Sequence, residues 1–506
     1  MILLWIFLLP LLGGAAAWFA GQRFPALSQW AGPASLLLAL VQLIVLWGRA
    51  ASPEAGWIVS WSIPWIPQLG MSLSFALDGL ALILVILTCL VGLVALFMVR
   101  DGAGSRAGMR RFLILATLSS LMGVFLAADL ALFFVFYEIM LVPVFALLLL
   151  GDHPNRVRAS MRFFIFTQAG GLLMLVSIFA LFFLHGQATG EYTFATEALL
   201  ATPLGATASK WIFLGFFLAF AVKLPLVPFH TWQADAYEAA PADTTVLLAG
   251  LMAKAAGYGL LRFAIPLAPE GAAHYASAIV LLGVITVIYC AWMAYGQNDL
   301  KRIIAYSSAS HLGFIALGAF SMSPLAQRGA VLQMFCHGIS VAGMFFIADL
   351  VERQMKTRDV EKLGGLWHTA PRLGAVAIVF AMATLGLPGL GNFAGEFMTL
   401  LGTFTTHPVA AGIAAIGAVL AAAYSLRVVQ RVFFGPKPEG VPAWDATPAQ
   451  LALCAALIAV LVWLGAYPKP FLDTAWQAGA APTALSSTSG SPLSGVSADI
   501  QNGEVQ

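Results

Sequence analysis

Residues 219–230 read AFAVKLPLVPFH, an apolar run that holds Lys223 together with Pro225 and Pro228. Each proline lacks an N–H and clashes with the carbonyl four residues back, so the sequence predicts a helix that breaks beside the lysine. A charge within a membrane-spanning run costs at least about 2.5–3.5 kcal/mol on insertion scales. Free carbonyls and water at the break can solvate the ammonium. An interrupted helix that carries a charge at mid-membrane is typical of transporters.

The composition of the whole chain places this run in a membrane protein. Of the 506 residues, 60% are hydrophobic and 9% are charged, against about 25% charged in ordinary soluble domains. The mean hydropathy is +0.90. These values exclude a soluble globular enzyme and a disordered chain. The long apolar runs exclude an outer-membrane barrel, whose strands alternate in polarity, and a net charge of +2 gives no sign of nucleic-acid binding.

The cysteines and glycines give no sign of a bound cofactor. Four cysteines lie in separate apolar runs, without the close spacing of a zinc, iron–sulfur or disulfide framework: Cys89, Cys290, Cys336 and Cys454. No glycine-rich loop follows a strand pattern, as a nucleotide-binding fold would require. We therefore expect no cofactor and no metal ion in this chain.

The apolar runs predict an all-α, polytopic membrane protein with about 14 transmembrane helices. The first run has no positive charge before it and is about 20 residues long, which favours an uncleaved helix over a cleaved signal peptide. The tail, residues 483–506, is rich in Ser, Gly and Thr and is expected to be disordered. The expected spans are 2–21, 28–48, 78–99, 109–128, 130–150, 160–185, 210–229, 243–263, 274–296, 300–321, 327–352, 373–404, 408–433 and 448–467.

Positive charges are unevenly divided between the two sides of this layout. With the N-terminus outside, the segments on the inner side hold 18 Lys and Arg, whereas those on the outer side hold five. This is the bias that the positive-inside rule expects, and it predicts that both termini lie outside. The two remaining lysines, Lys223 and Lys254, fall inside spans.

Four ionisable residues are predicted to lie within the membrane: Glu138, Lys223, Lys254 and Glu396. Such groups usually face the bundle interior or water and mark a function. We interpret them as proton-transfer residues, and Glu138 with Lys223 as a switchable acid–base pair. The blander alternatives are structural hydrogen bonds between helices and, for Lys223, snorkelling towards the surface. His337 and His311 are further relay candidates, because histidine titrates near neutral pH; ordinary core histidines are the alternative.

A second interrupted helix follows in residues 385–397, which read LGLPGLGNFAGEF. This break precedes Glu396, so two broken spans, the seventh and the twelfth, carry charges of opposite sign. Their separation by five spans predicts two inverted five-helix repeats, helices 4–8 and 9–13. The expected organisation is residues 1–108 with helices 1–3, repeats at 109–263 and 274–433, a last helix at 448–467 and the tail at 483–506.

Five stretches carry a resemblance to a known family. They are FYEIMLVP around Glu138, AVKLPLVPFHTW around Lys223, TLGLPGLGNFAGEF around Glu396, MAKAAGYGLLRF and DLKRIIAYSSASHLGF. Over residues 1–475 the chain resembles the antiporter-like membrane subunits of proton-pumping NADH:quinone oxidoreductase, respiratory complex I. It looks most like the M-type subunits. The L- and N-type chains usually have Lys where Glu396 stands, and nothing after residue 475 can form the long lateral helix of L-type chains.

The resemblance implies a proton-translocating subunit of a translocase, with protons as its substrate and no redox site of its own. Flavin, iron–sulfur clusters and quinone are expected in partner subunits. The implied surroundings are the bacterial cytoplasmic (inner) membrane, its lipid, and antiporter-like L- and N-type partners, with both termini on the periplasmic side. A subunit of a multi-subunit Na⁺/H⁺ antiporter and one of a membrane-bound hydrogenase-type complex remain alternatives. A structural scaffold does not need buried charges, and nothing in the residues indicates a quinone pocket.

One stretch departs from the family pattern. After His230 the family commonly has Trp-Leu-Pro-Asp-Ala-His, but this chain has Trp232-Gln233-Ala234-Asp235-Ala236-Tyr237. The proline and the second histidine are absent. A role for this loop in proton uptake from the inner side is therefore in doubt, whereas the intramembrane residues are unaffected.

Overall fold

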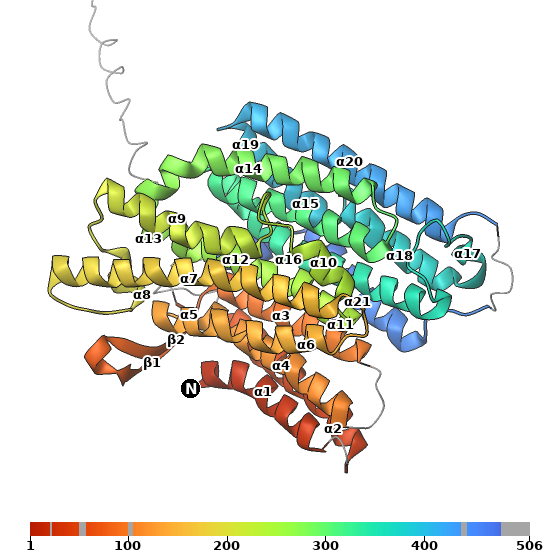
Figure 1. Cartoon of the computed structure of the whole chain (residues 1–506), viewed down its shortest axis with the longest axis horizontal. Coiled ribbons are helices and arrows are strands. Elements are labelled where there is room, and N and C mark those ends of the chain that lie inside the picture. Colours follow the sequence, from red (N-terminus) through yellow and green to blue (C-terminus); the bar gives the residue numbers. More distant parts are fainter. Residues whose placement is uncertain (21–22, 50–56, 100–104, 437–442, 477–506) are drawn as a thin grey trace, which may run out of the picture.

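The computed structural model describes residues 1–20, 23–49, 57–99, 105–436 and 443–476. Within these ranges, 13 helices are long and apolar enough to cross a membrane. They lie side by side along one common direction (Figure 1), as expected where each crossing satisfies its own backbone hydrogen bonds. The chain is therefore a multi-pass membrane protein. The predicted disordered tail, 483–506, lies outside the described residues.

The first half of the chain contains the helices α1 to α9 and one β-hairpin. The elements are α1 Ile2–Ala20, α2 Pro25–Arg49, β1 Val59–Ile66, the short 3₁₀ turn η1 Pro67–Leu69, β2 Met71–Leu77, α3 Gly79–Met98, α4 Ser105–Leu126, α5 Leu130–Ile139, α6 Leu141–Leu149, α7 Arg156–Thr189, α8 Thr196–Leu200 and α9 Ala206–Lys223.

The second half is wholly helical over the residues that the structure describes. Its elements are α10 Gln233–Ala239, α11 Ala242–Leu247, the π-helical turn η2 Leu248–Met252, α12 Ala253–Gly259, the π-helical turn η3 Leu260–Ala264, α13 Ile265–Leu267, α14 Pro269–Tyr295, α15 Leu300–Phe320, α16 Pro324–Met355, α17 Leu366–Thr369, α18 Pro371–Thr384, α19 Gly391–Phe404, α20 Pro408–Phe433, α21 Pro448–Ala466 and α22 Lys469–Trp476.

The twelfth predicted span, 373–404, is interrupted as its Gly/Pro cluster indicates. It consists of α18 and α19, and the connection between them has Gly386 at φ +79° and Gly389 at φ +96°. Non-glycine residues rarely adopt this left-handed region. Neither half is long enough to count among the 13 spanning helices, so this crossing is the fourteenth of the predicted layout.

The fifth predicted span is also interrupted, and the sequence analysis does not predict this interruption. α5 ends at Ile139 and α6 begins at Leu141. The cause is Pro143, because its ring clashes with the carbonyl four residues back, that of Ile139. The interruption is at Met140, two residues after Glu138, so a third crossing has a helix end close to a charged side chain.

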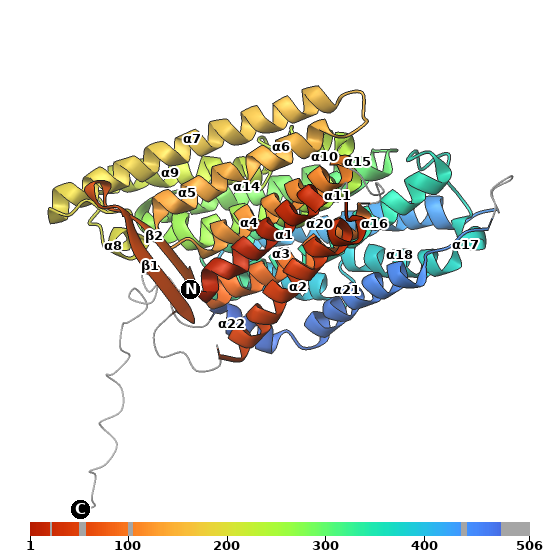
Figure 2. The same cartoon turned by 90° about the horizontal axis from the view of Figure 1, so that it is seen from below.

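The β-hairpin is an addition to the all-α prediction. β1 and β2 pair antiparallel through a turn that ends at Gly70, φ +62°. Figure 2 shows the hairpin at one end of the helix bundle, near the N-terminus. Its serines alternate with apolar residues in both strands, which is the period of a half-exposed sheet. The segment was not predicted as strand because it falls between two spans.

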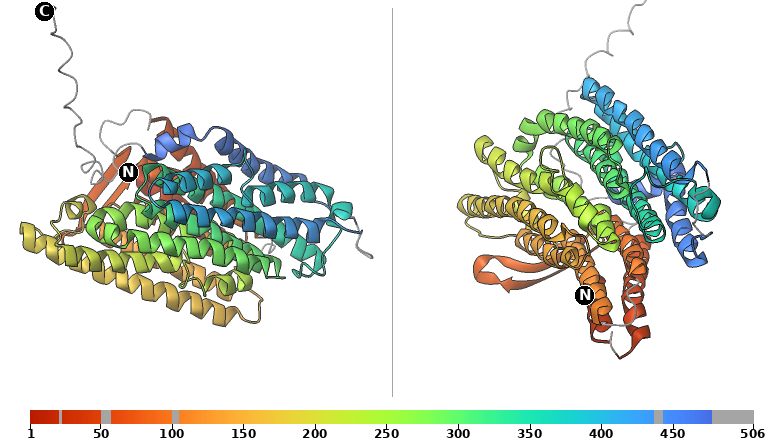
Figure 3. Two further views of the ribbon diagram at one scale, coloured as in Figure 1. Left: turned by 90° about the horizontal axis from the view of Figure 1, so that it is seen from above. Right: turned by 45° about the vertical axis from the view of Figure 1, so that its right-hand side comes forward.

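The polar residues of interest lie in the middle of the bundle. In the crossing 242–267, which comprises α11 to α13, every residue except Arg262 and Pro266 is buried, and most residues of α15 and α16 are buried as well. α14 packs on α15, and α16 packs on both α15 and α19. In Figure 3 the bundle is seen from a second direction, with the N-terminal helices on one side and the C-terminal helices on the other. α12, α15 and α16 are thus shielded from lipid by their neighbours.

Candidate functional site

Glu138 is the residue before the last one of α5, which ends at Ile139. Its carboxylate is partly buried and rests against Gly171 of α7. Neither oxygen has a hydrogen-bond partner of good geometry among the described residues. Gln168 of α7 is a polar neighbour of the carboxylate. A buried carboxylate with so few donors around it is costly, which points to a group whose charge or environment changes.

Lys223 is the last residue of α9, and a turn of nine residues separates it from α10. The turn follows from Pro225 and Pro228, as the sequence predicts. The ammonium is buried; it donates to the Tyr137 carbonyl at 3.1 Å and lies 3.1 Å from the centre of the Tyr137 ring. A carbonyl and an aromatic face are the contacts that stabilise a desolvated cation.

Glu138 and Lys223 are neighbours without a direct ion pair. The lysine contacts the carbonyl and the ring of Tyr137, the residue that precedes Glu138 in the chain. The two charges are near enough to influence each other. A small movement of the α5 end would therefore change their interaction, which is what a switchable pair requires.

Lys254 lies in α12, between the two π-helical turns η2 and η3. Single π-turns inside helices are frequent at functional sites, because they displace backbone groups from the regular ladder. The fully buried ammonium contacts the Ala249 carbonyl at 2.5 Å and His337 Nδ1 at 2.8 Å. When the lysine is charged, Nδ1 accepts this hydrogen bond, and the imidazole proton then sits on Nε2.

His311, Glu396, Gln333 and Tyr424 form a second buried cluster. Glu396 Oε1 lies 2.7 Å from His311 Nδ1 and accepts a hydrogen bond from Gln333 Nε2 at 2.8 Å. The other ring nitrogen of His311 lies 3.0 Å from the Tyr424 hydroxyl. The four residues come from α15, α19, α16 and α20, so the cluster forms only when these helices assemble.

The two clusters meet at the histidines. The rings of His311 and His337 are 5.7 Å apart, centre to centre. Two buried polar atoms, His337 Nε2 and Ser308 Oγ, have no hydrogen-bond partner among the described residues. A row of protonatable groups therefore runs from Lys254 through His337 and His311 to Glu396, with one gap of a size that a water molecule can bridge.

The structure thus brings together four of the six predicted residues in this row and places Glu138 and Lys223 as a separate pair. No chain of hydrogen bonds links Lys223 to Lys254 within the part of the chain that the structure describes. The sequence reading missed three contributors: Tyr137, Gln333 as a carboxylate ligand, and Tyr424. Tyr137 is next to Glu138 and was detectable, whereas Tyr424 lies in an ordinary helix and gives no signal.

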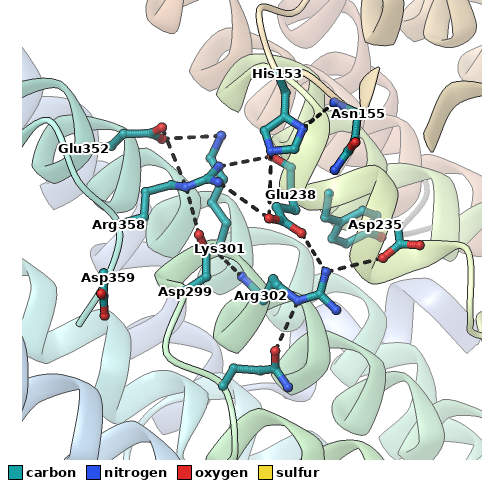
Figure 4. A network of polar contacts seen from close by, with 12 residues as sticks. His153, Asn155, Asp235, Glu238, Asp299, Lys301, Arg302, Glu352, Arg358 and Asp359 are labelled. Atoms are coloured by element: carbon teal, nitrogen blue, oxygen red, sulfur yellow. Dashed lines mark hydrogen bonds and ion pairs between the residues drawn. The ribbon is translucent and has the colours of Figure 1, made fainter. Parts of the chain in front are cut away.

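A network of charged side chains lies at the end of the bundle where α15 begins (Figure 4). Glu238 of α10 forms ion pairs with Arg302 at 2.6 Å and with Arg358 at 3.8 Å, and His153 lies 3.8 Å from its carboxylate. Asp235 of α10 pairs with Arg302 at 3.3 Å. The stretch after His230 that departs from the family pattern forms α10, and it supplies two carboxylates, Asp235 and Glu238, to this network.

Two further ion pairs extend this network across the helix ends. Arg358 contacts Asp299 at 2.9 Å, and Lys301 contacts Glu352 at 3.5 Å. Burial raises the pKa of Asp299 above its usual value, and the neighbouring Arg358 opposes that shift. The network joins the first half of the bundle to α15, α16 and the segment after α16.

The described residues contain no group of three or more His, Cys, Asp or Glu arranged to hold a metal ion. The buried row offers proton donors and acceptors. Lysine, histidine, glutamate and tyrosine in hydrogen-bond contact, inside a membrane, form the kind of chain through which protons pass.

Comparison with known proteins shows the family of the chain. The family model described as NADH:quinone oxidoreductase/Mrp antiporter, transmembrane, matches residues 127–421. NADH-quinone oxidoreductase subunit M of Pseudomonas aeruginosa is 42% identical over 486 residues, which cover 94% of this chain and 96% of that one. The subunit M of Escherichia coli K12 is 41% identical over 492 residues, covering 94% and 97%.

A solved structure gives the same result for the fold. A chain of respiratory complex I from Thermus thermophilus with bound NADH matches with a TM-score of 0.85 and 32% identity, covering 94% of this chain and 98% of that one. The resemblance noted in the sequence is therefore confirmed. The chain belongs to the NADH:quinone oxidoreductase/Mrp antiporter transmembrane family.

Proposed function

We propose that this chain is the M-type, antiporter-like subunit of NADH:quinone oxidoreductase and that it moves protons through its buried polar residues. The observation that carries the proposal is the row Lys254–His337–His311–Glu396, with two hydrogen-bonded pairs and histidine rings 5.7 Å apart. Burying an ionisable group in a membrane protein is unfavourable, so such groups are usually present because a function requires them. Proton transfer is a function that requires all four. The printed names of the relatives support the same assignment.

The pair Glu138–Lys223 acts as the switch in this proposal. An ionised Glu138 favours the protonated form of Lys223 through charge attraction. When the end of α5 moves and the attraction weakens, Lys223 releases its proton towards Lys254. The interruption after α5 near Glu138, and the contacts of Lys223 with Tyr137 of the same helix, support such a movement.

The second part of the path runs along the buried row. Lys254 passes a proton to His337 through their 2.8 Å contact, and water in the gap passes it to His311. Glu396 receives it at 2.7 Å and serves as the store on the exit side. Gln333 and Tyr424 position Glu396 and His311 by hydrogen bonds and do not themselves need to titrate.

The positions of these residues support the inverted repeats, which stay a prediction. Spans five and seven carry Glu138 and Lys223, whereas spans ten and twelve carry His311 and Glu396. The same two positions in each predicted repeat therefore hold an acid and a base, but with the types exchanged. Each predicted repeat, 109–263 and 274–433, contains one such pair. The first repeat holds the interrupted spans five and seven, and the second holds the interrupted span twelve.

We infer the surroundings from the family. The partners are antiporter-like L- and N-type subunits and lipid, and the flavin, iron–sulfur clusters and quinone belong to other subunits. NADH oxidation and quinone reduction there drive the switch through charge and helix movements. The location is the bacterial cytoplasmic (inner) membrane with both termini on the periplasmic side, as the uneven division of Lys and Arg favours.

The direct test is to change the switch in the assembled complex. Glu138→Gln and Lys223→Ala are each expected to lower the number of protons pumped per electron, because the acid–base pair is lost. Native gel analysis verifies assembly, and Glu270→Gln, an exposed carboxylate in the first turn of α14, is the matched control. An unchanged ratio in assembled Glu138→Gln and Lys223→Ala complexes would sink the proposed mechanism.

The family also contains Mrp antiporters, so the rival function has its own test. A Na⁺/H⁺ antiporter subunit predicts sodium-dependent quenching of a pH-sensitive dye in vesicles without NADH. We expect NADH-dependent, sodium-independent quenching. A sodium requirement would favour the rival.

A further inference from the structure

The buried face of α19 continues in polar residues beyond Glu396. Asn392, Glu396, Thr399 and Thr403 recur at the spacing of one helix face, and all four are at most 4% exposed. The opposite face is apolar and open to lipid, with Phe397, Leu401 and Phe404 among its residues. Small residues, threonine included, are common where membrane helices pack closely, and Thr399 lies against Gly329 of α16. A polar role for these residues must therefore be argued from their hydrogen bonding.

The two threonines are unusual among the buried threonines of this chain. Six others donate their hydroxyl to the carbonyl four residues back in their own helix: Thr88, Thr117, Thr167, Thr286, Thr384 and Thr474. That bond is the ordinary way to satisfy a helical threonine. The hydroxyls of Thr399 and Thr403 do not make it and have no hydrogen-bond partner among the described residues.

Other unpartnered atoms lie on the same helix or on α16, which faces it. Within the described part of the chain, Asn392 Oδ1 and Gln333 Oε1 are also buried without a hydrogen-bond partner. Gln333 binds Glu396 through its other amide atom, so this series of orphaned oxygens begins at the carboxylate itself. Buried polar atoms in native proteins are nearly always hydrogen-bonded, to protein or to ordered water.

The spacing of these groups suits single water molecules. With a rise of 1.5 Å per residue, Thr399 lies about 4.5 Å beyond Glu396 along the axis, and Thr403 about 6 Å beyond Thr399. Two hydrogen bonds through one water span about 5.5 Å. Thr403 is one residue from the end of α19, and Thr405 and Thr406 beyond it are exposed.

We propose that Thr399 and Thr403 line a water-filled exit that carries protons from Glu396 to the end of the bundle where α19 ends. Each hydroxyl accepts a proton from the water before it and donates its own proton to the water after it, so it is unchanged once it has reoriented. The predicted topology makes this the periplasmic end. The inference rests on the proposed function, since it needs Glu396 to hold a proton.

The test compares substitutions that keep shape with substitutions that keep the hydroxyl. In the assembled complex, the double change Thr399→Val with Thr403→Val is expected to lower protons pumped per electron to the value of Glu396→Gln. The double change to Ser keeps both hydroxyls and is expected to retain the wild-type ratio. Thr88→Val, which removes an equally buried but internally bonded hydroxyl, is the matched control.

The outcomes separate this inference from the proposed function. A wild-type ratio in the valine variant beside a lowered ratio in Glu396→Gln would overturn the exit and leave the proposed function standing. Equal losses in the valine and serine variants would assign the threonines to packing and also overturn it. If the valine variant does not assemble, a water-resolving map of the wild-type complex decides: ordered water between Glu396, Thr399 and Thr403 supports the exit, and dry contacts contradict it.

Discussion

Gly171 of α7 lies directly against the carboxylate of Glu138. A Cβ built on Gly171 overlaps Glu138 Oε1, the far end of a flexible side chain. The carboxylate can swing away from such a methyl group, so the helix pair need not separate. The residue therefore offers a way to move the switch carboxylate without removing it.

Gly171→Ala is expected to lower protons pumped per electron while the complex still assembles, because the displaced carboxylate no longer acts on Lys223. Gly412→Ala is the matched control, since Gly412 lies in α20 with nothing within 4 Å of the added methyl group. The ratio is measured from acidification and NADH oxidation in the same vesicles. A wild-type ratio in Gly171→Ala would show that the position of the Glu138 carboxylate is unimportant.

At the scale of single residues, the sequence indicated ionisable groups and missed neutral ones. Lys254 and Glu396 stand out because a charge in an apolar run is expensive. Tyr424 and Gln333 are cheaper to bury once hydrogen-bonded, so nothing in their local sequence distinguishes them from packing residues. Their roles depend on contacts between helices, and a linear pattern does not contain those contacts.

Interrupted helices are the elements that position the site, and glycine or proline causes the three that we identify. Pro225 and Pro228 end α9 at Lys223, and the Gly386–Gly389 turn separates α18 from α19. The sequence predicted both breaks. The third, in α5, was missed although Pro143 was visible in the same motif as Glu138, because one proline in a long apolar run is often tolerated in membrane helices.

Gly389→Ala tests whether the twelfth crossing needs its break. The added methyl group meets nothing within 4 Å, so the cost comes only from φ of +96°, where an L-residue loses about 1–2 kcal/mol. We expect a lower midpoint of thermal unfolding for the solubilised complex. Gly412→Ala, in a regular helix, should not lower that midpoint, and equal midpoints for the two variants would contradict a strained turn.

The β-hairpin shows where element prediction failed. Its strands alternate serine with apolar residues, but the segment is short and lies between two spans. Long apolar runs dominate any reading of a membrane protein, and a half-exposed hairpin gives a weaker signal. Helix ends also differed by a few residues, as at the sixth predicted span, 160–185, which the structure extends to Arg156–Thr189.

On the scale of the whole molecule, the ionic network at the end of α15 joins segments from both halves of the chain. Glu238 is its centre, with contacts to Arg302, Arg358 and His153. Because its side chain is only 24% exposed, solvent weakens these contacts less than those of a surface pair. The network therefore helps to hold α10 against the second half.

Glu238→Gln is expected to destabilise the assembled complex by about 1.5–3 kcal/mol, the range for a hydrogen bond to a charged group. The measurement is the midpoint of thermal unfolding at low and high salt. Salt screens the wild-type network, so the gap between wild type and variant should narrow as salt rises. The role assigned to Glu238 would be contradicted if, at low salt, Glu238→Gln had the wild-type midpoint of thermal unfolding. It would also be contradicted if Glu238→Gln lowered that midpoint no more than the exposed control Glu270→Gln does.

The whole-molecule architecture was largely predictable from sequence. The number of crossings follows from apolar run length, and the predicted sidedness follows from the division of Lys and Arg. The meeting of Lys254, His337, His311 and Glu396 was not predictable, because it depends on how α12, α15, α16 and α19 pack. These four residues lie far apart in the sequence and form one row only in the folded structure.

The central claim is that this row conducts protons, and Lys254 is the residue through which it is tested most directly. The measurement is the number of protons pumped per electron in an assembled complex that carries Lys254→Met, beside the exposed control Lys469→Met. We expect a lower ratio in Lys254→Met and the wild-type ratio in the control, because the methionine keeps much of the side-chain volume but holds no proton. A wild-type ratio in a fully assembled Lys254→Met complex would contradict the claim.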